Sequence, residues 1–428
     1  MHRLGFRRGW PLRAFGPDQR GAAMVVFALA VPALVGFAGL GVETGLWYLT
    51  KRQAQTAADA AALAAAIELS HGSNSTAAIQ AALADSARNG FVDGDDTKVV
   101  AAPVAGVAGQ IEVKVVRRQA LLFSALFMTQ PVSVGARAVA QAQPDGNACI
   151  LALDPTASAA VDVQGNPTVN LIGCVVAANS TADSAIKVAG NAEISAQSLW
   201  TAGDYVELGN THMTLAAPPV VAAWPLPDPY AGVSIPTNPG GCKYNKLPDY
   251  VAGQPMVLQP GVWCTDWVLH DTVQLQSGTY YLRNGSVTIN AAATVACSNC
   301  GATNSGVTIV LTGPAAGDMT INGGATVTLR APSGGGVPYP GMLLVQSRSA
   351  HKGGLTINGN SSLDLKGAVY FPNQSVDISG TSVSQASTGC VQVVAKKVRI
   401  LGNASLDDAG CAAIGAAPIH TVSAKLVE

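Results

Sequence analysis

The sequence is poor in charged and aromatic side chains, which make up 12% and 5% of its 428 residues. Soluble globular proteins have about 25% charged residues, so this composition disfavours a charged, helical enzyme. The formal net charge of −1 provides no overall positive field, and we therefore expect no nucleic-acid partner. What the sequence has in abundance is glycine, 46 residues, together with small apolar and hydroxyl side chains. This mixture favours closely wound β structure.

Charge is also absent from residues 21–42, a run of 22 residues that matches the thickness of a bilayer core. A signal peptide has a shorter apolar region and a cleavage site, so we expect an uncleaved anchor. Basic residues precede the run, whereas only Lys51 and Arg52 follow it closely. The positive-inside rule then predicts a cytoplasmic segment at 1–20, a transmembrane helix at 21–49 and a periplasmic remainder. The basic residues before the run are Arg3, Arg7, Arg8, Arg13 and Arg20.

Three residues mark the outer end of this run. Trp47 and Tyr48 are typical of the aromatic belt at a membrane interface, and we expect the Glu43 carboxylate to reach water there. The alanine-rich stretch 50–69 contains no Gly or Pro, so it should continue the helix beyond the membrane.

The segment 20–66 resembles the N-terminal region of the TadE/TadG-like Flp pilus-assembly proteins. The resemblance rests on Arg20-Gly21, Phe27-Ala28-Leu29, Pro32, Trp47-Tyr48 and the run Gln55-Thr-Ala-Ala-Asp-Ala-Ala-Ala-Leu63. It implies an inner-membrane pilus-assembly component whose partners are other Tad/Flp proteins and the lipid bilayer.

The sequence departs from that family at two places. The TadE-type minor pilins carry a glutamate at the fifth position after a processed glycine, and counting from Gly21 that position is Val26. An unprocessed, TadG-like anchor is therefore expected. Some TadG relatives carry a metal-binding DxSxS-type motif, and the nearest match is 377–381, Asp-Ile-Ser-Gly-Thr. It lies within a β-repeat and not before a helix, so we expect no metal site and no cofactor.

Residues 50–144 predict the helical stalk and a small α+β, pilin-like domain. A helix is expected at 76–88 and a second apolar helix at 120–128. Alternating apolar residues predict strands at 111–116 and 132–141.

A short pattern of alternating apolar residues and a Gly-Asn corner recurs from residue 161 onward. Repeats of about 20 residues are typical of solenoids, in which neighbouring units bury each other's apolar faces. The fold class expected for the second part is therefore a right-handed parallel β-helix-like solenoid, and the alternative is a β-sandwich with hairpin turns. The expected parts are 145–215 and 263–415 for the solenoid, 216–262 for an excursion with ten of the 24 prolines, and 416–428 for a C-terminal tail.

The chain contains eight cysteines, all after residue 148. An even set in an exported region predicts disulfides. Eight cysteines allow 105 connectivities, of which pairing in sequence order is the simplest. Zinc would require clustered ligands, and only Cys297 and Cys300 are close together in the sequence. The disulfide candidates are Cys149, Cys174, Cys242, Cys264, Cys297, Cys300, Cys390 and Cys411.

The alternative function is a β-helix that binds or cleaves an envelope polysaccharide. Glycoside hydrolysis requires two carboxylates across a cleft, and the candidates are Asp364, Asp377, Asp407 and Asp408. The basic residues available to a lyase are scattered: Lys366, Lys396, Lys397 and Arg399. Because Asp364 and Asp377 alternate with apolar neighbours, they are expected on a solvated strand face. We therefore expect a structural component of a Tad pilus or tight-adherence system, with no catalytic residues.

Overall fold

The computed structural model describes residues 19–70, 73–301, 304–359, 361–379, 383–384 and 389–427. The chain forms two compact units, 1–143 with 423–428, and 144–422. The strand β3 (Val132–Ala152) leads from the first unit into the second, and β28 (His420–Leu426) leads back. The segment predicted as a C-terminal tail, 416–428, contains the strand β28. The basic residues predicted to be cytoplasmic lie in 1–18 or at Arg20, whose side chain is likewise outside the described residues.

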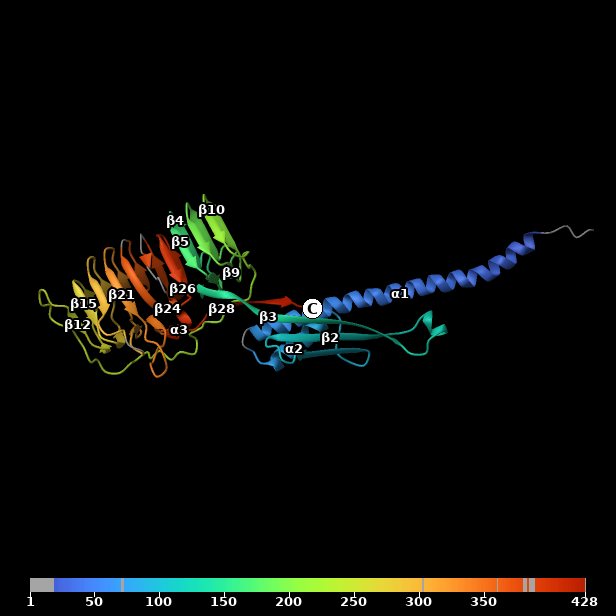
Figure 1. Cartoon of the computed structure of the whole chain (residues 1–428), viewed down its shortest axis with the longest axis horizontal. Helices are drawn as coiled ribbons and strands as arrows, with labels where there is room; N and C mark the ends of the chain where they lie inside the picture. The colour runs from blue at the N-terminus through green and yellow to red at the C-terminus, as the bar shows by residue number, and fades with distance from the viewer. Residues whose placement is uncertain are drawn as a thin grey trace, which may run out of the picture. The chain divides into compact units, whose positions relative to one another are not determined.

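The first unit is built on one long helix, α1 (Gln19–Ser70), as the sequence predicts (Figure 1). It packs against α2 (Ser75–Arg88) and against an antiparallel sheet of β1 (Thr97–Pro103), β2 (Gln110–Gln119) and β3. The alanines of α1 let the helix approach the sheet closely, and they are fully buried. These alanines are Ala54, Ala57, Ala58, Ala61, Ala62, Ala65 and Ala66.

Three details of this unit differ from the prediction. The helix α2 begins at Ser75, one residue before the predicted 76, and the side chain of Asn74 caps it by accepting a hydrogen bond from the Ala77 amide. The strand predicted at 132–141 runs on to Ala152. The prediction of a helix at 120–128 is wrong, because only the 3-10 turn η1 (Ser124–Leu126) forms there. The apolar residues of that segment do not pack on the sheet and remain exposed.

The second unit is mainly β, and its strands pair in parallel in three rows, which we call rows A, B and C. Row A follows the order β9, β6, β3, β26, β24, β22, β19, β16, β13. Row B follows the order β10, β7, β4, β26, β24, β23, β20, β17, β14. Row C consists of β11, β8, β5, β27 and of β12, β15, β18, β21, β24, β25. Because these pairings are parallel, the paired strands are not connected by hairpins, as they would be in the β-sandwich considered as the alternative.

The strands before the excursion are β4 (Val161–Gly165), β5 (Thr168–Ile172), β6 (Val175–Ala178), β7 (Ile186–Gly190), β8 (Glu193–Ala196), β9 (Leu199–Thr201), β10 (Tyr205–Gly209) and β11 (His212–Leu215). The first strands after it are β12 (Met256–Leu258), β13 (Gly261–Trp263), β14 (Trp267–Leu269), β15 (Thr272–Leu275), β16 (Gly278–Arg283), β17 (Val287–Ile289) and β18 (Thr294–Cys297). The remaining strands are β19 (Val307–Thr312), β20 (Met319–Ile321), β21 (Thr326–Arg330), β22 (Met342–Gln346), β23 (Leu355–Ile357), β24 (Ser362–Ile378), β25 (Val383–Ser384), β26 (Val391–Ile400) and β27 (Ala404–Asp407), followed by the short helix α3 (Cys411–Ile414). The strands therefore resume at Met256, earlier than the predicted 263.

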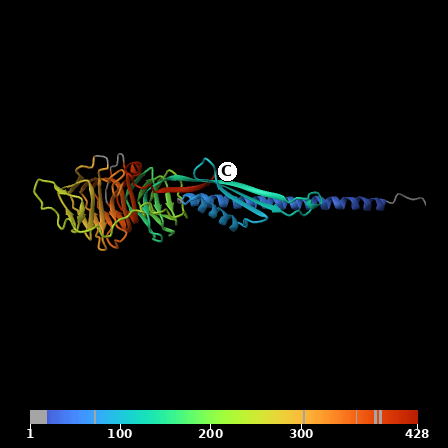
Figure 2. The same cartoon turned by 90° about the horizontal axis from the view of Figure 1, so that it is seen from below.

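The chain enters this stack of strands in its middle. The last long strand, β26, pairs with both β3 and β4, so that Val393 lies opposite Ile150 and Val398 opposite Val161. In Figure 1 the green strands β4, β5 and β10 accordingly lie beside the red β26, and the yellow β12 and β15 lie at the other end. The view turned by 90° shows the same succession of strands (Figure 2). The residues that join the ends of the stack are those of the proline-rich excursion.

The interior of the stack is filled by the alternating apolar residues of the repeat, which are buried in successive strands. The corners carry glycine because the backbone there has a positive φ, +102° at Gly165, +85° at Gly190 and +97° at Gly209. Asn358 donates a hydrogen bond to the Asn322 side chain of the neighbouring turn, at 3.2 Å. The two asparagines occupy the same position in two copies of the repeat, Asn322 after Ile321 and Asn358 after Ile357.

Candidate functional site

The N-terminal half of α1 exposes a wide apolar surface. Side chains from Met24 to Leu49 are largely uncovered, and Phe27 and Phe37 are more than 70% exposed. Among the described residues, α1 is the one helix long and apolar enough to cross a membrane. Its alanine-rich second half is instead buried against the sheet. The two halves of one continuous helix therefore have different surroundings. The second half packs on the sheet, and the first half presents an uncovered apolar surface to a membrane or a partner.

Glu43 lies at the junction of these halves and does not reach water as the sequence had suggested. It is 1% exposed. Its carboxylate accepts hydrogen bonds from the Leu122 amide at 2.9 Å, and from the amide and hydroxyl of Ser124, both at 2.6 Å. A buried carboxylate is tolerated when its oxygens are paired in this way. Glu43 thus fastens the segment between β2 and β3 to the helix.

We call that segment, residues 120–131, the apolar loop. It contains no charged residue, and Phe123 lies so close to α1 that a Cβ at Gly39 would be 2.3 Å from its ring. Most of its large apolar side chains point away from the unit's core; Phe127, for example, is 78% exposed. The exposed ones are Leu122, Phe123, Leu126, Phe127 and Met128.

The two residues predicted for the aromatic belt lie on the next turn of α1. Tyr48 is 65% exposed, and its hydroxyl accepts a hydrogen bond from Arg52 at 3.5 Å. Trp47 is partly exposed. Both side chains are accessible, as interfacial residues must be.

The excursion of the second unit, residues 216–255, is an extended strap. Its successive residues meet the strands of row A one after another. Ser198 donates to the Pro218 carbonyl, Trp200 to that of Trp224, and Asn179 forms two hydrogen bonds with the Leu226 backbone. Farther along, the partners come from β26, β24, β19 and β16: Gln392, Tyr370, Thr312 and Arg283. The strap therefore covers row A from one end of the stack to the other.

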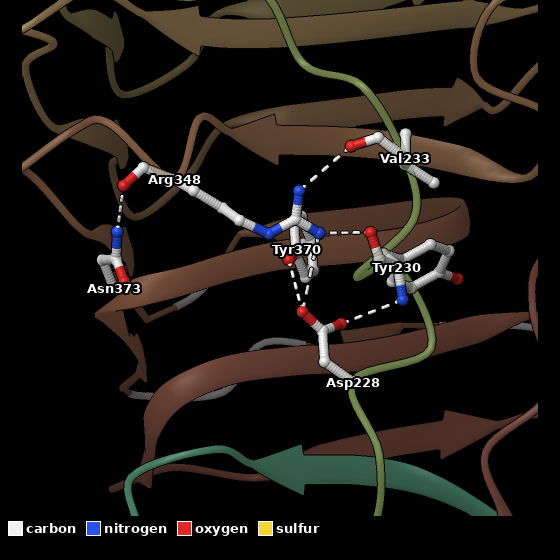
Figure 3. A network of polar contacts seen from close by, with 6 residues as sticks. All are labelled: Asp228, Tyr230, Val233, Arg348, Tyr370 and Asn373. Carbon is white, nitrogen blue, oxygen red and sulfur yellow. Dashed lines mark hydrogen bonds and ion pairs between the residues drawn. The ribbon is translucent and has the colours of Figure 1, made fainter.

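The centre of the strap is held by a polar network around Asp228 (Figure 3). The Asp228 carboxylate accepts hydrogen bonds from the Tyr370 hydroxyl at 2.7 Å and from the Tyr230 amide at 2.9 Å. Arg348 lies 3.6 Å from the same carboxylate and donates to the carbonyls of Val233, at 3.0 Å, and of Tyr230. Burial and the hydrogen bond to Asp228 raise the pKa of Tyr370 well above its ordinary value. The tyrosine therefore stays neutral and keeps donating.

The strap was foreseen only as an excursion, and none of the network residues was singled out from the sequence. The sequence did contain a signal for this network. Tyr370 on β24 and Gln392 on β26 alternate with residues that fill the interior of the stack, so they face outward, and yet both are buried. Buried polar groups of this kind require partners.

The candidate carboxylates do not form a pair across one cleft. Asp377 belongs to a ladder in row B, in which Asp377, Arg399, Asp162 and Lys187 stand opposite one another on β24, β26, β4 and β7. Arg399 lies 3.9 Å from Asp377 and 3.8 Å from Asp162. Burial, and to a lesser extent the Asp162 charge, raise the pKa of Asp377, and Arg399 opposes this. Alternating charges on paired strands stabilise their register.

Asp364 lies elsewhere, in row C, beside a cavity of about 310 Å³. The cavity is also lined by Arg330, Lys366 and the disulfide Cys297–Cys300. Arg330 Nε and Asp364 Oδ1 are buried there without a hydrogen-bond partner among the described residues. Of the basic residues considered for a lyase, Lys366 lines this cavity together with Asp364, and Arg399 belongs to the charge ladder of row B.

The cysteines form four disulfides in sequence order: Cys149–Cys174, Cys242–Cys264, Cys297–Cys300 and Cys390–Cys411. Asp408 lies with Cys149 and Cys174 in a group of the size that could hold a metal ion. A disulfide has no thiolate to offer a metal, and the same holds for Cys297 and Cys300. The DxSxS-like segment ends β24 at Asp377 and Ile378, and its residues 380–381 lie outside the described part.

Replacing Asp408 with asparagine is expected to raise the melting temperature at pH 7 by about 1–3 °C. Burial raises the pKa of Asp408, with the Asp407 charge acting in the same direction and a hydrogen bond to Asn147 opposing it. The native carboxyl therefore holds its proton to higher pH than the unfolded one, and stability falls as pH rises through that interval. The difference from the native chain should disappear below the ordinary range of an aspartate, about pH 3.5.

The matched control is Asp154→Asn, since Asp154 accepts hydrogen bonds from the Thr156 and Ala157 amides that asparagine can also accept. Thermal melts at pH 7 and pH 3.5 measure both variants. A lower melting temperature for Asp408→Asn at pH 7 would contradict this account.

Comparison with known proteins returned one result, which covers the N-terminal apolar helix. No curated protein and no solved structure matched the chain. Residues 21–68 matched the family model described as putative Flp pilus-assembly TadE/G-like. This is the resemblance seen in the sequence, and the matched range coincides with helix α1. The chain therefore carries a TadE/G-like pilus-assembly domain at its N-terminal apolar helix.

Proposed function

We propose that this chain is a single-pass inner-membrane protein that acts as a structural component in the assembly of a Tad (Flp) pilus or tight-adherence system. Its N-terminus lies in the cytoplasm and both folded units lie in the periplasm. The observation that carries the proposal is the coincidence of the TadE/G-like match, residues 21–68, with a helix whose first half is apolar and exposed. The excess of arginine before the helix supports the orientation.

The second unit is proposed to be a right-handed parallel β-helix that presents a binding surface and does not catalyse a reaction. Support for the architecture comes from the three rows of parallel strands, in each of which neighbours such as β13 and β16, β14 and β17, or β15 and β18 are separated by about one repeat. Support for a non-catalytic role comes from the scattered carboxylates, since Asp377 is engaged in a charge ladder. The four disulfides fit an oxidising compartment such as the periplasm.

Introducing a charge into the exposed half of α1 is expected to abolish function. An arginine at the centre of a membrane helix costs about 2.5–3.5 kcal/mol in insertion, and Leu34 is exposed in the middle of the apolar run. In a strain lacking the gene, the native chain should restore surface pili and adherence, and Leu34→Arg should not. Electron microscopy of pili, surface adherence and recovery in the membrane fraction are measured together.

Val92→Arg is the matched control, because Val92 is equally exposed but lies outside α1. It should restore pili like the native chain. If strains lacking the gene assemble normal pili and adhere normally, the proposal is wrong.

A polysaccharide-binding role is the second candidate, and the cavity at Arg330, Asp364 and Lys366 favours it. Its polar lining and unpaired buried atoms suit hydroxyl-rich ligands. The same strains separate the two roles: a gene-deleted strain that assembles normal pili but no longer retains envelope polysaccharide would favour the second.

A further inference from the structure

The apolar loop, residues 120–131, is a second apolar surface that lies beside the exposed half of α1. The contacts that place it are all within the first unit: Glu43 holds Leu122 and Ser124, and Phe123 covers Gly39. A soluble domain gains nothing by exposing five large apolar side chains on one short loop, and such patches mark a binding surface. The question is which partner covers it.

The position of the loop along α1 identifies that partner. The sheet is tied to the helix where Lys51 donates to the Gly135 carbonyl, at 2.5 Å, and Gln55 to that of Arg137, at 3.1 Å. Gly39 lies 12 residues before Lys51, which is about 18 Å along a helix. The loop therefore extends past the edge of the sheet and back along the helix. Gly39 itself lies inside the uncharged run 21–42, about 4.5 Å from its outer end.

We propose that the apolar loop enters the outer half of the lipid bilayer beside α1, so that the protein contacts the membrane at two places. The inference rests on the proposed anchoring of α1, because the loop borders the surface that the bilayer would cover. Leu126, Phe127 and Met128 contact the acyl chains. The loop contains no charge that insertion would bury.

Glu43 acquires a defined role in this arrangement. At this depth a free carboxylate would be costly, but three hydrogen bonds from the loop satisfy its oxygens. The loop in turn has its amides at Leu122 and Ser124 paired, which a membrane-embedded backbone requires. Glu43 is thus a positioning residue that fixes how far the folded unit stands from the membrane.

The experiment is a depth measurement with spin labels on the full-length protein, its disulfides intact, in lipid nanodiscs. One cysteine is introduced at a time: Phe127→Cys in the loop, Phe37→Cys on α1, and Val92→Cys, an exposed apolar position elsewhere in the unit. Accessibility to oxygen, which concentrates in lipid, is compared with accessibility to a water-soluble nickel chelate. We expect the labels at 127 and 37 to lose access to nickel, and the label at 92 to keep it.

The outcomes separate the inference from the proposal beneath it. A label that is lipid-exposed at 37 but water-exposed at 127 overturns the loop insertion and leaves the anchor intact, in which case a protein partner covers the loop. Labels that are water-exposed at both positions overturn the anchor and the insertion together. In the Glu43→Leu background the label at 127 should become more mobile and regain nickel access, whereas Glu43→Gln, which keeps an acceptor, should retain more of the native depth.

Discussion

Gly190→Ala is expected to lower the free energy of unfolding of the second unit by about 3–5 kcal/mol, the sum of a backbone strain and a steric clash. The strain arises because Gly190 has φ +85°, a conformation that side chains with a Cβ rarely adopt. The clash arises because a Cβ there would lie 2.4 Å from the carbonyl oxygen of Gly165, in the adjacent turn of the stack. The midpoint of urea unfolding should fall by about 1 M or more.

Tryptophan fluorescence follows this transition well, since four tryptophans, Trp200, Trp224, Trp263 and Trp267, belong to the unit. The matched control is Gly173→Ala. Gly173 has φ +70°, but its Cβ would meet no atom within 4 Å, so that variant bears the strain alone and should lose about 1–2 kcal/mol. Equal losses in both variants would show that the turns are not stacked in contact at Gly190.

Much of this molecule is encoded locally and could be predicted. Helix α1 is predicted by an uncharged run and an alanine-rich run, and each of these patterns is contained within a few consecutive helical turns. Each disulfide joins two consecutive cysteines of the chain, such as Cys390 and Cys411. The parallel pairing of the strands follows from a repeat in which Leu355 and Ile357, for instance, stand opposite Val376 and Ile378.

What was missed depends on contacts between residues far apart in the chain. The pairing of Val393 with Ile150 places the end of the repeat beside its beginning, and no local pattern specifies it. The segment 120–128 was predicted as a packed helix because it is apolar, but its side chains have no core to enter. Glu43 was placed in water because its hydrogen-bond donors, 79 to 81 residues away, leave no trace in the sequence around it.

Asp228→Ala is expected to loosen the strap and to lower the stability of its attachment by about 2–6 kcal/mol, the sum for two buried groups that lose their acceptor. The variant leaves the buried Tyr370 hydroxyl and the Tyr230 amide without their acceptor, at about 1–3 kcal/mol for each unsatisfied group. It also removes the carboxylate opposite Arg348. That guanidinium is 36% exposed, so water replaces part of the lost interaction. Cleavage by chymotrypsin after Tyr230, which is 2% exposed, should therefore accelerate by about 30-fold or more.

Asp249→Ala provides the control, because Asp249 lies in the same strap but its ion pair with Lys246 is almost fully exposed, and the expected change is below about 1 kcal/mol. Tyr370→Phe, alone and combined with Asp228→Ala, measures how much of the loss belongs to their hydrogen bond.

The strap is the segment that connects the two ends of the stack of strands, which the chain enters in its middle. If the network holds it, opening at Asp228 should also lower the urea midpoint of the whole unit. Unchanged cleavage in Asp228→Ala would mean that the strap is held by its apolar contacts with row A, such as those of Leu226 and Tyr230, and not by the network.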